Sequence, residues 1–509
     1  MTITNRSKKR HQQEIQRMVE RYSGKVDRSN PCLSVILAGG FGKRIKSERP
    51  KVLHEVWGKS SVGRVAEAAK KGLRSPNQII VVGIGAIEVM EVIGRQPHTL
   101  FAYQKEQKGT GHALQVAMKA LGRRPFGGTV VVFPSDMCLI DPGTVRKFIR
   151  TFEGSELDMM VLTGRYKGPV EMNRYGRIVR VPKTDADGKA SEELENDVIE
   201  IMEHKDILRL ENGAPHEAAY RGRRYAFSRQ ELIENREFNS GVYAFRGPAL
   251  MKHLYRITSD NVQKEIYVTD LVSIFNKAKL RVGAYQLKNN TPIQAFNDKS
   301  ELKALHSIAQ RMRYDQLKDI ITIEDEEAFF IADEVVRDIL RMEKKGKPLD
   351  IVIGPGAYVS KGVRLNRGVQ IGRNAVLDGN IVLGEGAKVH EGANLSTYPH
   401  QTLLLGERSE ILQDDIVKGN THIGNDCRIE SSVNITGSDE FPTRIGDNVV
   451  IKGTSYVFGS IIEKNCWIEH SVIIRMHADC VKKKDGTIRK IKYYLPPPEG
   501  IDSLRPIEK

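Results

Sequence analysis

The sequence lacks the features of a secreted or membrane protein. It has no run of about 18 apolar residues, and its N-terminus lacks the apolar core of a signal peptide. Its five cysteines are odd in number and far apart, with no Cys-x-x-Cys pair that would suggest zinc. We therefore expect a cytoplasmic protein with reduced thiols and no membrane partner.

Aromatic residues are also scarce, at 6%, and no recognised nucleic-acid motif is present. The formal net charge is nevertheless +15. A basic surface attracts small polyphosphates as well as nucleic acid. Without aromatic stacking platforms or a motif, we expect no nucleic-acid partner. At 509 residues, 40% of them hydrophobic, the chain is long enough for two or three soluble domains.

The most informative stretch present is Ser34–Lys51. The apolar run Val35-Ile36-Leu37 predicts a short buried strand, and glycines 39, 40 and 42 follow it directly. Glycine lets backbone N–H groups approach phosphate oxygens, and Arg44 and Lys51 add positive charge nearby. The pattern is neither a Walker loop nor a dinucleotide fingerprint. It predicts a phosphate-binding loop of another kind.

Strands and helices alternate from Cys32 onward. Residues 79–82 and 129–133 are typical of buried strands, and helical patterns run near 62–72 and 112–121. This alternation predicts a mostly parallel sheet with helices on both faces. Ligands of such sheets sit at the carboxyl ends of the strands, where the glycine loop would lie.

Two further polar segments follow strands. Gly109-Thr110-Gly111 predicts a tight turn before a helix beginning at His112, and the amide of the nearby Gln104 can read a base edge. Asp136 follows the strand at 129–133, where a carboxylate beside phosphates suits Mg²⁺.

The order Leu-Ala-Gly-Gly-x-Gly-x-Arg followed by Pro-Lys resembles the signature of the sugar-1-phosphate nucleotidyltransferases. Within that family the chain looks most like the bifunctional N-acetylglucosamine-1-phosphate uridyltransferases, and the resemblance covers roughly residues 33–300. Ser135 replaces a glycine of the family and Ser240 a threonine. Further matching segments are Tyr103–Ala113, Tyr175–Ile178, Glu203–Asp206, Glu237–Gly241, Tyr267–Asp270 and Gln294–Asp298.

The resemblance implies roles for individual residues. Arg44, Lys51 and Asp136 would be catalytic, and Mg²⁺ would be held by Asp136 and Asn297. Gln104, Gly109 and Thr110 would contact the base, and Gly176, Glu203 and Asn239 would surround the sugar. The substrate-binding set implied in this way comprises Leu37, Ala38, Gly39, Gly40, Gln104, Gly109, Thr110, Gly176, Glu203, Asn239 and Asn297.

Four segments have a predicted structural role. Ile15, Met18, Val19 and Tyr22 form one apolar face of a short helix, which Pro31 would end. Tyr267–Asp270 is interpreted as a helix cap. Two polar insertions near 183–196 and 209–235 are expected to be solvated loops, and a lid over the sugar site stays open as an alternative.

The second half changes period. Apolar residues recur every six positions from Ile353 to Leu395, and small or apolar residues stand two positions before each. A six-residue period predicts a left-handed parallel β-helix. The pattern lapses over 396–410 and resumes at Ile411. After Val457 it slips by one residue, to Ile462, Ile468 and Ile474.

In the bifunctional family this β-helix transfers an acetyl group, using a histidine and a tyrosine. The aligned positions here are Asp414 and Val417, and the family's Asn-Tyr-Asp-Gly becomes Asn434-Ile435-Thr436-Gly437. Without the histidine the usual general base is missing. The other histidines of this half, among them His400 and His422, are interpreted as surface or packing residues. Acetyl transfer therefore remains only an alternative.

The sequence thus predicts an α/β nucleotidyltransferase domain with a Rossmann-like, mixed, mostly parallel sheet, followed by the β-helix. The expected function is Mg²⁺-dependent transfer from an NTP, with UTP preferred, to a sugar-1-phosphate, with N-acetylglucosamine-1-phosphate preferred. Another sugar or base, or a non-catalytic scaffold, stays open, and a homotrimer through the β-helix is expected. The expected parts are a helical arm at 1–30, the nucleotidyltransferase domain at 31–300, a helical linker at 301–348, the β-helix at 349–485 and a tail at 486–509.

Overall fold

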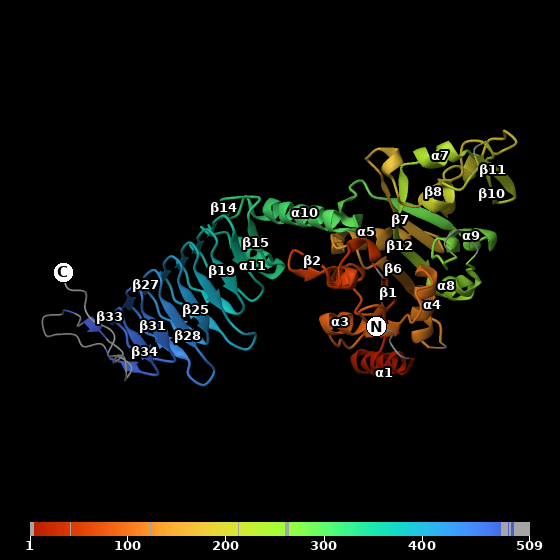
Figure 1. The fold of residues 1–509 in the computed structure, drawn as a ribbon. Coiled ribbons are helices and arrows are strands. Elements are labelled where there is room, and N and C mark those ends of the chain that lie inside the picture. The colour runs from red at the N-terminus through yellow and green to blue at the C-terminus, as the bar shows by residue number, and fades with distance from the viewer. Residues whose placement is uncertain are drawn as a thin grey trace. The chain divides into compact units, whose positions relative to one another are not determined.

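The computed structural model describes residues 5–40, 42–122, 124–211, 213–259, 264–479, 487 and 490–492 (Figure 1). The chain divides into two compact units, residues 1–305 and 306–509. Within the described ranges, no helix combines the length and the apolar character needed to cross a bilayer. Cys480 and most of the predicted tail at 486–509 lie outside the described residues.

A twisted sheet organises the first unit. β1 pairs in parallel with β4 and β6, and β4 pairs in parallel with β5. β12 runs antiparallel between β6 and β7, so the sheet is mixed and mostly parallel, which confirms the predicted fold class. In spatial order the strands are β13 (Val282–Gln286), β7 (Met159–Arg165), β12 (Glu237–Arg246), β6 (Thr129–Pro134), β1 (Cys32–Ala38), β4 (Gln78–Val82) and β5 (Thr99–Tyr103).

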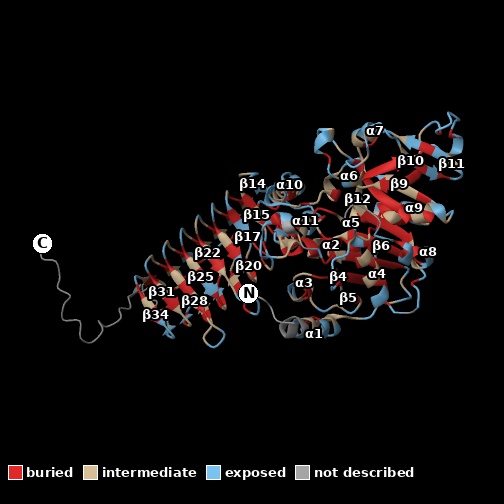
Figure 2. Ribbon diagram, turned by 45° about the vertical axis from the view of Figure 1, so that its right-hand side comes forward, coloured by how far each residue is buried: buried red, intermediate tan, exposed pale blue. Residues whose placement is uncertain are grey.

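Helices cover both faces of this sheet, and buried residues fill the space between the sheet and the helices on each face (Figure 2). The apolar strand runs are buried on both sides, as expected for parallel strands. One face carries α2 (Ser61–Leu73), α3 (Ala86–Ile93) and α5 (Pro142–Glu153), and the other carries α4 (Thr110–Ala120), α8 (Gly247–His253) and α9 (Asp270–Lys277). α4 thus begins at Thr110, two residues before the predicted start.

The N-terminal helix α1 (Asn5–Tyr22) packs on the first of these faces. Ile15 is buried, and Met18, Val19 and Tyr22 contact the same core cluster. The helix ends at Tyr22, well before Pro31, and Gly24 then donates its N–H to the carbonyl of Thr99 at 2.7 Å. The apolar spacing therefore predicted the helix and its buried face, and only the end point was wrong.

The insertion at 209–235 is not the solvated loop that the sequence predicted. It contains the antiparallel hairpin β10 (His216–Tyr220) and β11 (Arg223–Phe227), followed by α7 (Arg229–Glu234). Tyr225 is fully buried in a small cluster that also contains Val181 and Ile199. The insertion at 183–196 connects β8 (Arg177–Arg180) to β9 (Val198–Met202).

The second unit is a three-sided parallel β-helix, which confirms the second half of the predicted fold class. Its first sheet has strands β14 (Thr322–Ile323), β16 (Val352–Ile353), β18 (Gln370–Ile371), β21 (Lys388–Val389), β24 (Glu410–Ile411), β27 (Arg428–Ile429), β30 (Val450–Ile451), β33 (Trp467–Glu469) and β36 (Lys490–Lys492). Its second has β15 (Phe329–Ile331), β17 (Ala357–Val359), β19 (Val376–Asp378), β22 (Asn394–Ser396), β25 (Ile416–Gly419), β28 (Asn434–Gly437), β31 (Tyr456–Phe458) and β34 (Val472–Ile474). Its third has β20 (Ile381–Leu383), β23 (Leu403–Leu405), β26 (Thr421–Ile423), β29 (Thr443–Ile445), β32 (Ile461–Ile462) and β35 (His477–Ala478).

Side chains of the six-residue repeat fill this β-helix. Ile353, Ile371 and Val417, for example, are at most 1% exposed. Two details differ from the sequence prediction. The lapse over 396–410 contains strand β23, so the irregular stretch is shorter than expected. Ile474 is 40% exposed and Ile473 takes the core position, because the register slips by one further residue.

The stretch 301–348 contains more than helices. α10 (Lys299–Leu317) and α11 (Asp333–Glu343) are present, but β14 and β15 lie between them. Both strands pair in parallel with the next coil of the β-helix. The β-helix sheets therefore begin near Thr322, before the boundary that the sequence suggested.

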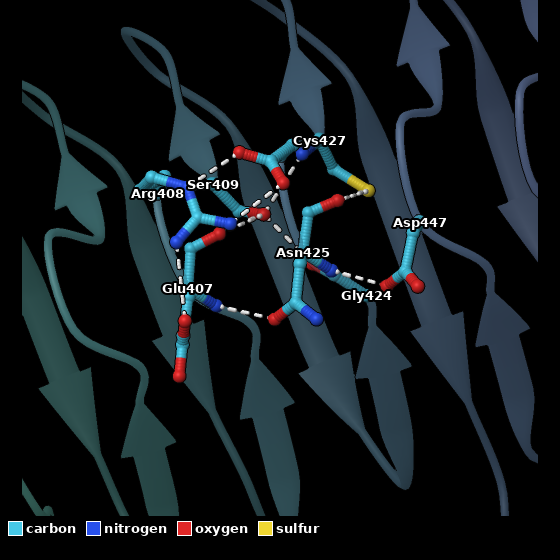
Figure 3. A network of polar contacts seen from close by, with 8 residues as sticks. Glu407, Arg408, Ser409, Gly424, Asn425, Cys427 and Asp447 are labelled. Carbon is cyan, nitrogen blue, oxygen red and sulfur yellow. Dashed lines mark hydrogen bonds and ion pairs between the residues drawn. The ribbon is translucent and has the colours of Figure 1, made fainter.

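Buried hydroxyls fasten successive coils at the corners of the β-helix (Figure 3). Ser409 is fully buried, donates its hydroxyl to the carbonyl of Gly424 at 2.7 Å, and accepts the N–H of Cys427 at 2.9 Å. Beside it, Asn425 accepts the N–H of Glu407 at 2.8 Å and donates its own N–H to Asp447 at 2.7 Å. Each contact joins one coil to the next.

Candidate functional site

The glycine loop lies at the carboxyl end of β1, where the sequence predicted a ligand site. A Cβ on Gly39 would stand 2.8 Å from Oε1 of Gln104. Gly42 has φ +57°, and a Cβ there would stand 2.5 Å from the Cβ of Lys51. Beside Gly40 no atom lies within 4 Å of the corresponding position. Glycine is therefore needed at 39 and 42 so that two predicted functional side chains can approach the loop.

Four predicted site residues meet beside this loop. Nζ of Lys51 donates to Oδ2 of Asp136 at 2.6 Å and to Oδ1 of Asn297 at 3.2 Å. Nη2 of Arg44 donates to the same Asn297 oxygen at 2.8 Å. The two oxygens expected to bind a metal thus converge on one point, where a positive charge already sits. Arg44 is exposed, whereas the side chain of Lys51 is 13% exposed.

Ser135, which replaces a glycine of the resembling family, does not point at this cluster. Its hydroxyl donates to the carbonyl of Leu37 at the end of β1, at 2.7 Å. The carbonyl of Ser135 accepts the hydroxyl of Ser61 at 2.6 Å. The extra side chain therefore ties the loop before Asp136 to β1, while the backbone carbonyl of the same residue ties the loop to α2. Ser61 was not identified from the sequence, because a serine in the first turn of a helix has no distinctive signal.

The predicted base-contacting residues lie on the other side of the glycine loop. Gln104 is buried, and its Nε2 donates to the carbonyl of Gly109 at 3.1 Å and lies 3.2 Å from Nδ1 of His112. His112 thus contacts and orients the glutamine. The hydroxyl of Thr110 accepts the N–H of Val268 at 3.2 Å, so its side chain is engaged within the protein.

Sequence reasoning missed two residues beside Gln104. A Cβ on Gly83, directly after β4, would stand 2.5 Å from the carbonyl oxygen of Gly39 and 3.0 Å from Nε2 of Gln107. Gln107 also donates to the carbonyl of Gln104 at 3.2 Å. The position of a glycine at the carboxyl end of a buried parallel strand was the signal that could have revealed Gly83.

The three residues predicted to surround the sugar also contact one another. The N–H of Asn239 donates to the carbonyl of Gly176 at 2.9 Å. A Cβ on Gly176 would stand 3.2 Å from Oε1 of Glu203. The amide of Asn239 donates to the hydroxyl of Tyr243 at 2.7 Å, which adds a residue that the sequence did not identify. β12 carries both Asn239 and Tyr243, and its bulge between Asn239 and Val242 places them.

These sugar-side residues lie next to the phosphate-side cluster. A Cβ on Gly241 would stand 3.4 Å from Pro134, the last residue of β6, which directly precedes Ser135 and Asp136. Ser240, which replaces a threonine of the family, donates its hydroxyl to the carbonyl of Leu162 at 2.6 Å. The hydroxyl thus fastens the bulge of β12 to β7. The bulge of β12 that carries Asn239 therefore lies close to the end of β6, which leads into Asp136.

Burial disturbs the carboxylates of the sugar side. Desolvation, assisted by the nearby Asp206 and Asp270 carboxylates, raises the pKa of Glu203 to about 7, against the opposing charge of Arg177. Burial and Asp206 raise the pKa of Asp270 to about 6. Asp270 is the first residue of α9, and Thr269 caps that helix without a side-chain hydrogen bond. The segment Tyr267–Asp270, which was predicted to cap a helix, therefore also places a carboxylate and the buried hydroxyl of Tyr267 near Glu203.

Comparisons with known proteins show which families this chain resembles. Residues 34–207 match the family model described as the MobA-like NTP transferase domain. The "Bifunctional protein GlmU" of Thermobifida fusca (strain YX) is 33% identical over 337 residues, which cover 65% of this chain and 62% of that protein. The protein of the same name from Syntrophotalea carbinolica is 35% identical over 279 residues, covering 55% of this chain and 51% of the relative. The chain thus matches half to three-fifths of the length of these relatives.

Among solved structures, a UDP-glucose pyrophosphorylase complexed with UDP-glucose is 16% identical, with a TM-score of 0.37. It covers 55% of this chain and 98% of that chain. The family resemblance that the motifs predicted is confirmed by the sequence comparisons only, which are the family model and the GlmU relatives.

Proposed function

We propose, from the premise that the chain carries a sugar-1-phosphate nucleotidyltransferase domain similar to that of GlmU proteins, that it transfers a nucleotidyl group to a sugar-1-phosphate. The NTP would be UTP and the sugar N-acetylglucosamine-1-phosphate, with pyrophosphate as the second product. One observation carries the proposal: Arg44, Lys51, Asp136 and Asn297 converge beside the glycine loop.

These residues also suit the Mg²⁺ that the family implies. The oxygens of Asp136 and Asn297 both lie within hydrogen-bond distance of one ammonium group, so they converge on a position that suits a cation. A carboxylate and an amide oxygen are hard ligands of the kind that Mg²⁺ prefers, with phosphates and water completing the shell. When bound, the ion would neutralise phosphate charge and orient the reacting groups.

The chain's own residues would do the rest by positioning and charge stabilisation. In the proposed reaction a phosphate oxygen of the sugar attacks the α-phosphorus in line, and the bond to the β-phosphate breaks. Arg44 and Lys51 would stabilise negative charge on the α-phosphate and on the leaving pyrophosphate. The glycine loop would bring backbone N–H groups to the same phosphates. Replacing either Arg44 or Lys51 by a neutral residue should lower the rate by roughly 10²–10³.

On the sugar side, Glu203 and Asn239 offer an acceptor and an amide at fixed positions for sugar hydroxyls. On the base side, the buried amide of Gln104 is held by His112 and Gly109, ready to read a base edge. Neither arrangement selects one base or one sugar, so another nucleotide or another sugar-1-phosphate remains the alternative to be tested.

The test is pyrophosphate release across a panel of NTPs and sugar-1-phosphates. We expect release with UTP and N-acetylglucosamine-1-phosphate, and loss of it in Asp136→Ala. Arg49→Met is a matched control, because Arg49 is in the same loop segment but pairs with Glu55 at 3.0 Å. Preference for another pair would change the assigned substrates. No release with any pair would overturn the proposal in favour of a non-catalytic scaffold.

A further inference from the structure

The cations of the proposed phosphate site occupy the oxygens that would hold the metal. Asn297 Oδ1 accepts hydrogen bonds from both Arg44, at 2.8 Å, and Lys51, at 3.2 Å. An amide oxygen has two lone pairs, so both are engaged. Lys51 also holds Oδ2 of Asp136 at 2.6 Å. A divalent ion bound by these two oxygens would have to displace both cations from Asn297.

The surroundings of Lys51 hold it in this position. Gly42 packs against its Cβ so closely that any larger residue would collide. Nζ lies 5.3 Å from the centre of the Phe296 ring, a cation–π contact. The side chains of Lys51 and Asp136 are 13% and 24% exposed, so water screens their interaction only partly. The contact is therefore stronger than an ordinary surface ion pair.

Other carboxylates lie near this cluster, but they do not compensate for the two cationic side chains, so they do not favour binding of a free metal ion. A carboxylate oxygen of Glu301 accepts the N–H of Asn297, and Asp298 accepts the N–H of Glu301, so both carboxylates are engaged with the backbone. A divalent ion without nucleotide would meet the ammonium of Lys51 and the guanidinium of Arg44 at hydrogen-bond range from its ligands. A triphosphate supplies anionic oxygens to which both side chains can turn.

We propose that Lys51 and Arg44 exclude free divalent cations from Asp136 and Asn297, so that the site takes the metal only together with a triphosphate. This inference rests on the proposed function, because it assigns the same four residues to one phosphate and metal site. By linkage, nucleotide and metal then favour each other's binding by the same factor. Lys51 thus has two roles. It binds phosphate when the nucleotide is present, and without nucleotide it occupies the oxygens of Asp136 and Asn297 that would bind the metal.

The test uses Mn²⁺ as the probe and no nucleotide, with the free ion measured by electron paramagnetic resonance. In Lys51→Met the ammonium is gone but an apolar stem remains to pack against Phe296. We expect this variant to bind one Mn²⁺ between tenfold and a hundredfold more tightly than the wild type, a typical coupling range. Thermal unfolding of each variant checks that the fold is retained.

Two further variants make the result specific. Arg49→Met removes an equal charge from the same segment without touching Asp136, and it should bind Mn²⁺ like the wild type. The double variant Lys51→Met with Asp136→Asn should lose the gain. Equal Mn²⁺ affinities in the wild type and Lys51→Met, or a gain that survives loss of the Asp136 carboxylate, would overturn the exclusion.

The two proposals can fail separately. The Mn²⁺ titration contains neither substrate, so it reports the Lys51 contact whatever the chain catalyses. Normal pyrophosphate release with equal Mn²⁺ affinities would overturn the exclusion alone. Absence of release from every substrate pair would overturn the proposed function, and with it the role of the exclusion in catalysis.

Discussion

At the scale of single residues, Glu203 lies where the fold disfavours its ionisation. Burial raises its pKa from 4.5 to about 7, with the Asp206 and Asp270 carboxylates adding to the effect. In the unfolded chain the carboxyl loses its proton near the lower value, while the folded protein retains it until about pH 7. The free energy of unfolding therefore falls between those two values, and the full deficit is present above about pH 7.

Glu203→Gln should remove that deficit, because glutamine cannot ionise. At pH 5 the variant and the wild type should unfold at similar denaturant concentrations. At pH 8 the variant should be more stable by roughly 1–3 kcal/mol. Chemical denaturation across this pH range measures the difference. The exposed Glu91→Gln on α3 is the control and should show no such trend, and a constant difference for Glu203→Gln at all pH values would contradict the assignment.

The residue types of the site could be predicted from the sequence, but their pairing could not. Glycines 39 and 42, Lys51 and Asp136 follow short strands at recognisable spacing. Lys51 and Asn297 are 246 residues apart, and their contact depends on the folded path and on side-chain torsions. Likewise the turn of Ser135 toward Leu37, and not toward the oxygens of Asp136 and Asn297, is a torsional choice that sequence spacing does not encode.

At the scale of elements, the hairpin β10–β11 shows where pattern reading failed. Its turn is Arg221-Gly222, and both residues have positive φ, as a type I′ hairpin turn requires. Arginine is an unusual first residue for such a turn, so the signal was weak. The buried positions, Ala218, Tyr220 and Tyr225, stand among charged residues and exposed alanines, so the segment looked solvated. Only the packing against Val181 and Ile199 shows the apolar face.

The corner hydroxyls of the β-helix lead to a prediction at this scale. Ser409→Ala would leave the N–H of Cys427 without its side-chain acceptor in a buried position (Figure 3). We expect the β-helix to lose about 1–3 kcal/mol of stability, the range for an unsatisfied buried donor. Thermal unfolding followed by circular dichroism measures the loss.

Ser431→Ala is the matched control, because the hydroxyl of Ser431 donates to Gln413 at 3.0 Å on the exposed outside of the same β-helix. It should change stability by no more than about 0.5 kcal/mol. Equal effects of the two substitutions would show that the buried corner contact does not fasten the coils.

At the scale of the whole molecule, the repeat explains why the second unit was the easier half to predict. Each coil contacts only its neighbours, so one short period describes many turns. The prediction was wrong at Ile474, where the register slips once more, and the predicted irregular stretch after β22 is shorter than expected. A homotrimer through the β-helix stays a prediction, which light scattering of the purified chain would check.

The last prediction concerns the chemistry of the β-helix, which the sequence left as an alternative. The position aligned with the family's tyrosine is Val417, which is fully buried in the core of the coils, so no side chain there can reach a substrate. The position aligned with the histidine is Asp414, with φ +58°. His400 does pair with Asp439 at 2.7 Å, but both side chains are more than half exposed, on the outside of the coils.

We therefore expect no acetyl transfer from acetyl-CoA to glucosamine-1-phosphate. The assay is release of the coenzyme A thiol, with the pyrophosphate assay on the same preparation showing that the protein is intact. His400→Ala tests this exposed pair, since thiol release that the substitution abolishes would identify His400–Asp439 as a general base and contradict the prediction. Absence of thiol release would show that the β-helix does not transfer an acetyl group between these two substrates, as the buried Val417 and the missing histidine predict.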